Sequence, residues 1–188
     1  NQPDCPKATH DKLKKLITEY IPHEIQSIIN DNNYFVKGRV IRGLWAHVPW
    51  IGIHKKNINS SATRGVYIAI LFNVLGDGLS LSLVHGTEFF TSIKKLKNRI
   101  VDCQKNLEVS DISFKKEPLN KLVPNTGIYK CNNGDVVKYN SGSRPRKYAQ
   151  SNIVGKSIGE WISVDIISDL QYLVKLYDNC TTINITVD

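Results

Sequence analysis

Two long stretches of this sequence, residues 32–76 and 136–159, contain no acidic residue, although the 188-residue chain has 17 Asp and Glu. The same stretches hold 11 of its 25 Lys and Arg residues, so the remainder has 14 bases against 17 acids. The net charge of +8 therefore originates in these two segments. Such clustering indicates a surface for a polyanion, because cations displace the counterions of phosphates.

Other absences exclude several classes of protein. The longest apolar run, residues 66–72, is much shorter than the roughly 20 residues of a membrane span. No two of the four cysteines lie closer than 28 positions, which excludes zinc-ribbon spacing. No GxxxxGK[ST] segment is present to bind nucleotide phosphates. We therefore expect no membrane partner and no cofactor, and a reducing, cytoplasmic location. The lack of Met and the Asn at position 1 favour one module of a longer protein.

The hydrophobic pattern predicts a single α+β domain, with a mostly antiparallel, curved β-sheet flanked by helices. Apolar spacing predicts helices over residues 9–30, interrupted at Pro22, over 88–107 and over 163–178. Alternation predicts strands over residues 34–41, 49–54, 65–72, 79–85, 112–122 and 151–158, and a hairpin of 128–131 with 136–139. We expect an N-terminal helical segment (1–33) that packs on the core, a DNA-binding domain (34–180) and a C-terminal tail or linker (181–188).

Candidate catalytic groups are few. His47 and His54 lack the spacing of metal ligands, so structural or surface roles are expected for the histidines. A nuclease needs clustered acids to hold Mg²⁺, and Asp111 and Glu117 approximate such a cluster poorly. We therefore expect a protein that is not an enzyme and holds no metal. A Mg²⁺-dependent DNA nuclease and a general nucleic-acid-binding module remain as alternatives.

Three short segments carry the most specific signal. They are Gly-Leu-Trp-Ala-His-Val-Pro-Trp-Ile (43–51), Arg-Gly-Val-Tyr-Ile-Ala-Ile-Leu-Phe (64–72) and Pro-Arg-Lys-Tyr-Ala-Gln-Ser (145–151). In order and approximate spacing they resemble the N-terminal DNA-binding domain of McrB-type modified-cytosine restriction proteins. The resemblance covers roughly residues 34–178. It is weak over 87–142, where this chain is longer.

The resemblance implies base flipping, in which a modified cytosine leaves the duplex and enters an aromatic pocket. The pocket residues carried over by motif are Trp50, Tyr67, Leu71 and Tyr148. The wedge and groove positions are Arg42, where the family pattern has an aromatic residue, Gly43 and Trp45. Aromatic rings would restore the stacking that a flipped base loses. Ordinary core packing is the alternative explanation for the strand residues among them.

Phosphate contacts are expected from bases and a hydroxyl in the two acid-free stretches. These residues are Lys37, Arg39, Lys55, Lys56, Arg64, Arg144, Arg146, Lys147 and Ser151. The lysines of residues 94–97 are expected to form a solvated helix face, with a second DNA site as the alternative. The implied function is a non-catalytic module that targets a modification-dependent restriction system to duplex DNA carrying modified cytosine, 5-methylcytosine first. Cleavage and nucleotide hydrolysis would belong to a fused or associated motor or nuclease.

Overall fold

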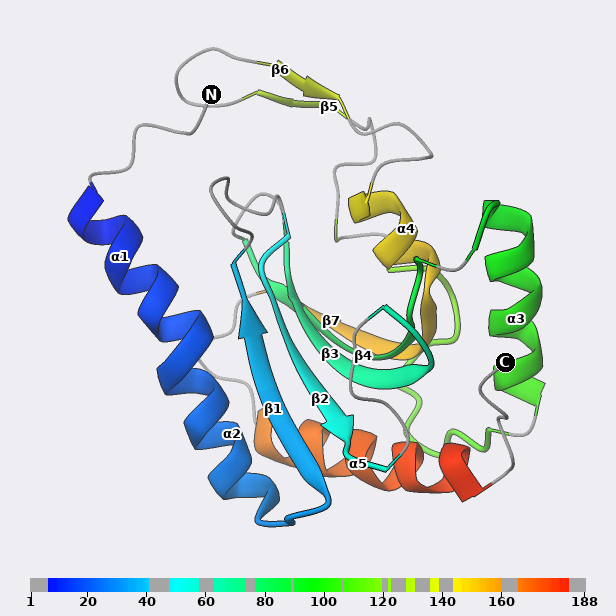
Figure 1. Cartoon of the computed structure of the whole chain (residues 1–188). Coiled ribbons are helices and arrows are strands. Elements are labelled where there is room, and N and C mark those ends of the chain that lie inside the picture. The colour runs from blue at the N-terminus through cyan, green and yellow to red at the C-terminus, as the bar shows by residue number, and fades with distance from the viewer. Residues whose placement is uncertain are drawn as a thin grey trace.

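A curved, five-stranded antiparallel sheet forms the centre of the computed structural model (Figure 1). The structure describes residues 7–40, 48–57, 63–73, 77–88, 90–105, 107–119, 122, 128–130, 136–138, 144–159 and 166–182. The helical elements are α1 (Lys7–Lys15), the π-helical turn η1 (Leu16–Tyr20), α2 (Ile21–Ile29), α3 (Ile93–Lys105), α4 (Arg144–Gln150) and α5 (Ile166–Thr182). The strands are β1 (Tyr34–Arg39), β2 (Trp50–Lys55), β3 (Val66–Phe72), β4 (Leu79–His85), β5 (Ile128–Lys130), β6 (Val136–Lys138) and β7 (Asn152–Ile158).

The strands of the sheet lie in the order β1-β2-β3-β4-β7, and each neighbouring pair is antiparallel. β5 and β6 form a separate two-stranded ribbon. In Figure 1, α5 crosses below the sheet and α1 and α2 run beside β1. α3 and α4 lie toward the opposite edge of the sheet from β1. This arrangement confirms the predicted α+β class with a largely antiparallel sheet and flanking helices.

One face of the sheet is aliphatic. Its residues on β2, β3 and β4 are Ile51, Ile53, Val66, Ile68, Ile70, Leu79, Leu81 and Leu83. α3 and α5 cover this aliphatic face with apolar residues that include Leu96, Ile100, Leu170, Leu173 and Tyr177. Burying each Ile or Leu side chain contributes about 2 kcal/mol. Because successive strand residues point to opposite faces, this packing fixes which side chains reach the other face.

The other face, which we call the aromatic face, has its own buried cluster. Its members are Val48, Trp50, Tyr67, Ala69, Leu71, Val84, Leu119, Leu122 and Ala149. Several of them come from β2 and β3, and Ala149 comes from α4. The aliphatic and aromatic clusters thus lie on opposite sides of the same strands.

The helix break predicted at Pro22 does not occur, and Figure 1 shows α1 and α2 as one continuous rod. A wider π-helical turn precedes the proline, and the Ile21 N–H donates to the Leu16 carbonyl five residues back. Pro22 follows this turn directly, at the start of α2, so the wider turn lets the rod continue past a residue that has no N–H. This turn passes so close to β1 that a Cβ at Gly38 would overlap the backbone oxygen of Ile17.

The strand predicted over residues 112–122 is wrong. In this segment the structure has an isolated bridge between Lys115 and Gly155 on β7. Side chains hold the segment instead: the Asn152 amide donates to the carbonyls of Lys115 (3.1 Å) and Glu117 (2.6 Å). The Lys116 ammonium donates to the Gln104 and Leu107 carbonyls, both at 2.9 Å. Within the described residues of this segment, pairing with β7 is confined to this bridge, and side-chain hydrogen bonds supply the other attachments.

Two further sequence expectations differ from the structure. The segment around Tyr148, for which the sequence predicted no helix, is the helix α4, and Pro145 at its start is compatible with a first helical turn. α5 extends to Thr182, so the tail boundary expected at residue 181 falls inside a helix. No helix in the described residues is long and apolar enough to cross a membrane.

Gly38→Ala should lower the free energy of unfolding by about 3 kcal/mol, because the new methyl group collides with rigid backbone rather than with a movable side chain. Denaturant titration of the purified domain measures this. Gly159→Ala is the matched control, since a Cβ there meets nothing within 4 Å. Equal stability of the two variants would contradict the close approach of η1 to β1.

Candidate nucleic-acid interface

The structure brings together the four residues expected to form a base pocket. Trp50 on β2 is the register partner of Leu71 on β3, and directly opposed residues point to the same face. The Trp50 and Tyr67 rings are 6.3 Å apart between centroids, tilted by 48°. Tyr148 on α4 packs against the buried cluster to which these three residues belong. We call Trp50, Tyr67, Leu71 and Tyr148 the aromatic cluster.

The members of the aromatic cluster differ in exposure. The strand residues are almost fully buried, with Trp50 7%, Tyr67 4% and Leu71 3% exposed. Tyr148 is half-buried. Burial, with the nearby Tyr148, raises the pKa of Tyr67 above its ordinary value, so its hydroxyl remains protonated. Tyr148 is therefore the member that solvent and a ligand reach first.

A row of stacked rings supports Tyr67 on the side facing β1. His54 stacks on Tyr67 with centroids 4.9 Å apart, and Phe35 on β1 stacks on His54 at 5.0 Å. Gly52 makes room for the rings, because a Cβ there would lie 2.8 Å from Trp50 Cζ3 and 2.6 Å from His54 Nε2. The aromatic face thus has a floor of packed rings on β1, β2 and β3.

Hydrogen bonds at the end of α4 position Tyr148. The Ser151 hydroxyl donates to the Tyr148 carbonyl at 2.8 Å, and the Ser151 N–H donates to the same oxygen at 3.1 Å. Ser151 is 1% exposed, so its hydroxyl lies away from any surface that a phosphate would touch. The expected phosphate contact at Ser151 is thereby corrected to a positioning role for Tyr148.

Positive charges lie on two sides of the aromatic cluster. Arg39 is the register partner of Trp50 and Lys37 that of Gly52, so both exposed side chains of β1 belong to the aromatic face. Arg146 and Lys147 are half-exposed on α4, directly before Tyr148. Four of the expected phosphate contacts therefore flank the cluster, from β1 and from α4.

Other expected phosphate contacts lie at the opposite end of the strands. Lys55 ends β2, about 16 Å along the strand from Trp50 at 3.3 Å per residue. Lys56 follows it, and Arg64 precedes β3, at the end of that strand away from Leu71. The structure does not bring these three bases to the cluster.

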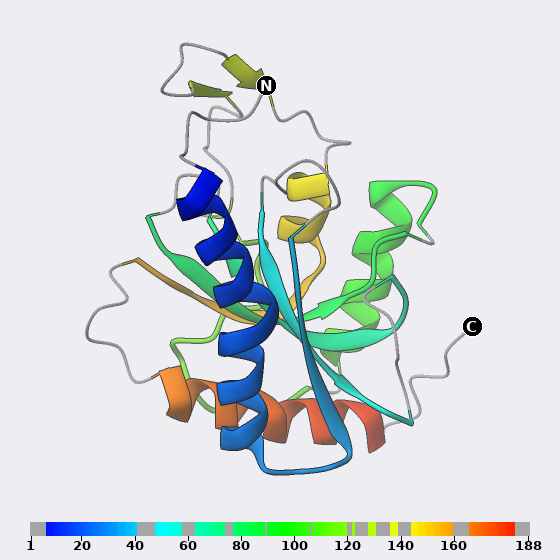
Figure 2. The same cartoon turned by 60° about the vertical axis from the view of Figure 1, so that its left-hand side comes forward.

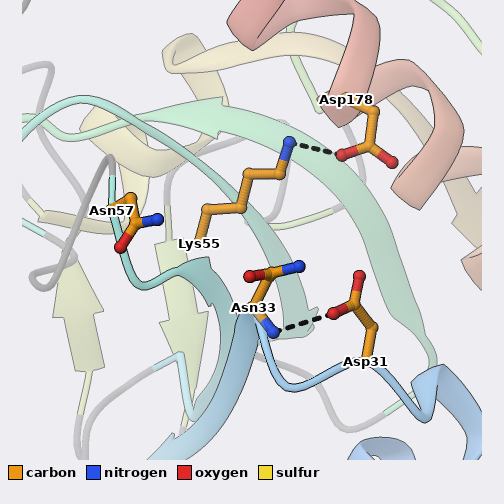
Figure 3. A pocket seen from close by; sticks show the side chains of 5 residues that line it. All are labelled: Asp31, Asn33, Lys55, Asn57 and Asp178. Atoms are coloured by element: carbon orange, nitrogen blue, oxygen red, sulfur yellow. Dashed lines mark hydrogen bonds and ion pairs between the residues drawn. The ribbon is translucent and has the colours of Figure 1, made fainter.

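Lys55 is engaged in an ion pair with Asp178 of α5 (Figure 3). Its ammonium also lies over the rings of Tyr34 (5.7 Å) and Tyr177 (5.9 Å). Asp178 accepts a hydrogen bond from the Tyr34 hydroxyl at 2.5 Å, and burial with this bond raises the pKa of Tyr34. The 280 Å³ hollow beside this pair, which Asp31 and Asn33 also line, combines two carboxylates with one lysine, which does not favour a phosphate.

Part of the expected site lies outside the described residues. This applies to Arg42, Gly43 and Trp45 of the wedge and groove, and to the side chain of Arg144 at the start of α4. Within the residues that the structure describes, no group of three or more His, Cys, Asp or Glu could hold a metal ion. Cys103 and Cys180 are buried free thiols.

Sequence reasoning missed the part that His54 plays in this face. It is 2% exposed, and burial, with the nearby Lys37, lowers its pKa to about 4. The signal was present in the sequence, since Trp50, Gly52 and His54 alternate along one strand and so share a face. The sequence left structural and surface roles open for His54, and its 2% exposure supports the structural one.

The sequence was compared with protein families and with curated proteins. The family model described as MrcB-like, N-terminal domain matches residues 3–182. No curated protein matches this sequence. The match extends from α1 to the end of α5 and includes the three segments that carry the resemblance, which is thereby confirmed at the level of the family.

The buried His54 predicts a pH-dependent stability. The unfolded chain binds a proton at this histidine below pH 6.5, whereas the folded protein binds it only below about pH 4. The free energy of unfolding should therefore fall as pH falls through this window, by about 2 kcal/mol from pH 7 to pH 5 for this group.

His54→Gln should remove this contribution, although losing the ring stack makes the variant less stable at pH 7. Denaturant titrations at both pH values measure the difference, with His23→Gln, a change at an exposed residue, as the control. An unchanged pH dependence in His54→Gln would refute the buried, neutral state of His54.

Proposed function

We propose, since this chain belongs to the MrcB-like N-terminal domain family, that it binds duplex DNA carrying a modified cytosine and holds that base outside the helix. Domains of this family are DNA-binding targeting domains of restriction systems. The finer proposal concerns the ligand: 5-methylcytosine, turned out of the duplex and bound at the aromatic cluster. Cleavage and nucleotide hydrolysis belong to an associated motor or nuclease, and the module itself acts in the cytoplasm without catalysis.

The observation that carries this proposal is the convergence of Trp50 and Tyr148. They are 98 positions apart in the sequence, one on a strand and one on a helix, and they pack in one cluster. Had they lain on opposite faces of the sheet, no single pocket could use both. The base would enter beside the half-buried Tyr148 and stack against the rings behind it.

The energetics favour such a site with modest selectivity. Extruding a base costs a few kcal/mol of stacking and pairing, and each aromatic contact to a base returns about 1–3 kcal/mol. A buried methyl group adds about 0.8 kcal/mol, which is roughly a fourfold preference at room temperature. Contact of the 5-methyl group with an apolar residue such as Leu71 would therefore give a preference for methylated DNA rather than absolute discrimination.

The charges flanking the cluster suit the DNA backbone. Lys37 and Arg39 on one side, and Arg146 and Lys147 on the other, would contact phosphates on either side of the extruded nucleotide. Phosphate contacts of this kind position the duplex without reading its sequence. Their place around the cluster supports a duplex that crosses the molecule from β1 to α4.

A general nucleic-acid-binding module without base flipping is the second candidate. The near-complete burial of Trp50, Tyr67 and Leu71 favours it, because the same residues would serve as ordinary core. Under this alternative Tyr148 and the flanking bases bind nucleic acid, but the modification has no effect on affinity.

Tyr148→Ala should weaken binding to a duplex with one 5-methylcytosine by about tenfold or more, since a stacking ring is lost. It should weaken binding to the unmodified duplex less, by a margin of about fourfold, which is the preference that the methyl contact gives the wild-type protein. Fluorescence anisotropy titrations of both duplexes at one stated salt concentration measure the ratio. Tyr148 is suitable because it is half-buried, so its truncation leaves the sheet intact.

Lys147→Ala, at the residue next to Tyr148, is the matched control for Tyr148→Ala. It should lower the affinity for both duplexes alike and reduce the slope of log K against log salt by about 0.9. The proposal fails if the wild-type protein binds the modified and unmodified duplexes equally. Equal binding together with a preference for single strands would instead favour the second candidate.

A further inference from the structure

α3 presents a basic face that the proposed pocket does not use. The helix buries Leu96, Ile100 and Cys103 against the aliphatic face of the sheet. The lysines at positions 94, 95 and 97 are all exposed. Residues 93–101 include these lysines and Arg99 but no acid. We call Lys94, Lys95 and Lys97 the α3 lysines.

The α3 lysines lack acidic partners within the part of the chain that the structure describes. The ion pair on this helix joins Lys105 to Asp102 at 2.7 Å, in its last turns. Among those described residues, no ion pair neutralises the charge at the start of α3, in contrast to Lys55, which pairs with Asp178.

These lysines also lie where a helix disfavours them. The first turn of α3 contains no acid, although the N-terminus of a helix attracts negative charge and repels positive charge by about 0.3–1 kcal/mol per group. Lys94 and Lys97 are three positions apart, and like charges at this spacing repel by a few tenths of a kcal/mol. A bound anion would reverse both effects, so the arrangement costs stability in the free protein and is favourable against a polyanion.

The position of α3 connects this face with the proposed pocket. α3 packs against α4, and Figures 1 and 2 both show the first turns of α3 beside α4. The Gln104 amide donates to the Ile153 carbonyl at 2.8 Å, which ties α3 to the strand that directly follows α4. The bases of α4 and the α3 lysines therefore lie on adjacent helices.

We propose that the α3 lysines bind phosphates of the same duplex, on the flank of the modified base that passes over α4. This inference rests on the proposed function, in which α4 lies against the extruded nucleotide. It adds a backbone contact surface that requires duplex beyond the modified site and is indifferent to the modification.

The test is the double variant Lys94→Ala/Lys97→Ala, assayed on a duplex that extends well beyond the modified cytosine on both sides. The slope of log K against log salt should decrease by about 1.8, for two lost phosphate contacts. Affinity at 0.1 M salt should fall on the order of tenfold, equally for modified and unmodified DNA. On a duplex truncated at the flank that reaches α3, the variant and the wild-type protein should bind alike.

Lys175→Ala is the control, because it also removes an exposed positive charge, but from α5, which crosses below the sheet in Figure 1. It should leave the slope of the wild-type protein unchanged. A Lys94→Ala/Lys97→Ala slope equal to that of the wild-type protein, or a loss equal to that of the control, would overturn the proposal.

The outcomes separate this inference from the proposed function. The wild-type protein could show no preference for modified DNA while the α3 variant still lowers the salt slope. That result would refute recognition of the modified base and support phosphate binding by the α3 lysines. If the wild-type protein prefers modified DNA and the α3 variant leaves the salt slope unchanged, the base pocket is supported. The α3 lysines are then a solvated helix face.

Discussion

Packing of the aliphatic face against α3 and α5 is the constraint on which the rest of this structure depends. Once Ile51, Ile68 and Ile70 are buried there, the pleat sends their sequence neighbours to the other side. Trp50, Tyr67 and Leu71 thereby reach the aromatic face together. A one-residue shift in the register of β2 would exchange the two sets. The stability of the core and the composition of the candidate pocket are thus set by the same strand pairing.

Helix α4 completes the aromatic cluster, and its attachment is specific. Ser151 holds the Tyr148 carbonyl, and the segment that bridges to β7 at Lys115 packs Leu119 against the same cluster. The Leu119 N–H donates to the Ala149 carbonyl at 3.0 Å. Tyr148 therefore stands on a short helix fixed at its C-terminal end, which suits a residue proposed to contact a base at the edge of a rigid sheet.

The sequence predicted the class of fold, the strands of the central sheet and the convergence of Trp50 with Tyr148, because these follow from alternation and from motif order. It did not predict the π-helical turn before Pro22 or the helical state of α4. Those depend on backbone hydrogen bonds and on packing between distant segments. Charge alone was also insufficient: Lys37 and Lys55 looked equivalent in an acid-free stretch, but only the structure shows that Lys55 is paired with Asp178.

The central claim is that the modified base leaves the duplex, and fluorescence of 2-aminopurine placed directly beside the modified cytosine tests it most directly. Extrusion removes a stacking neighbour of the probe, so its emission should rise when the wild-type protein binds modified duplex. The rise should be much smaller with Tyr148→Ala at saturating protein. Saturated binding of the wild-type protein without any increase in emission would contradict base flipping, even if the affinity for DNA were high.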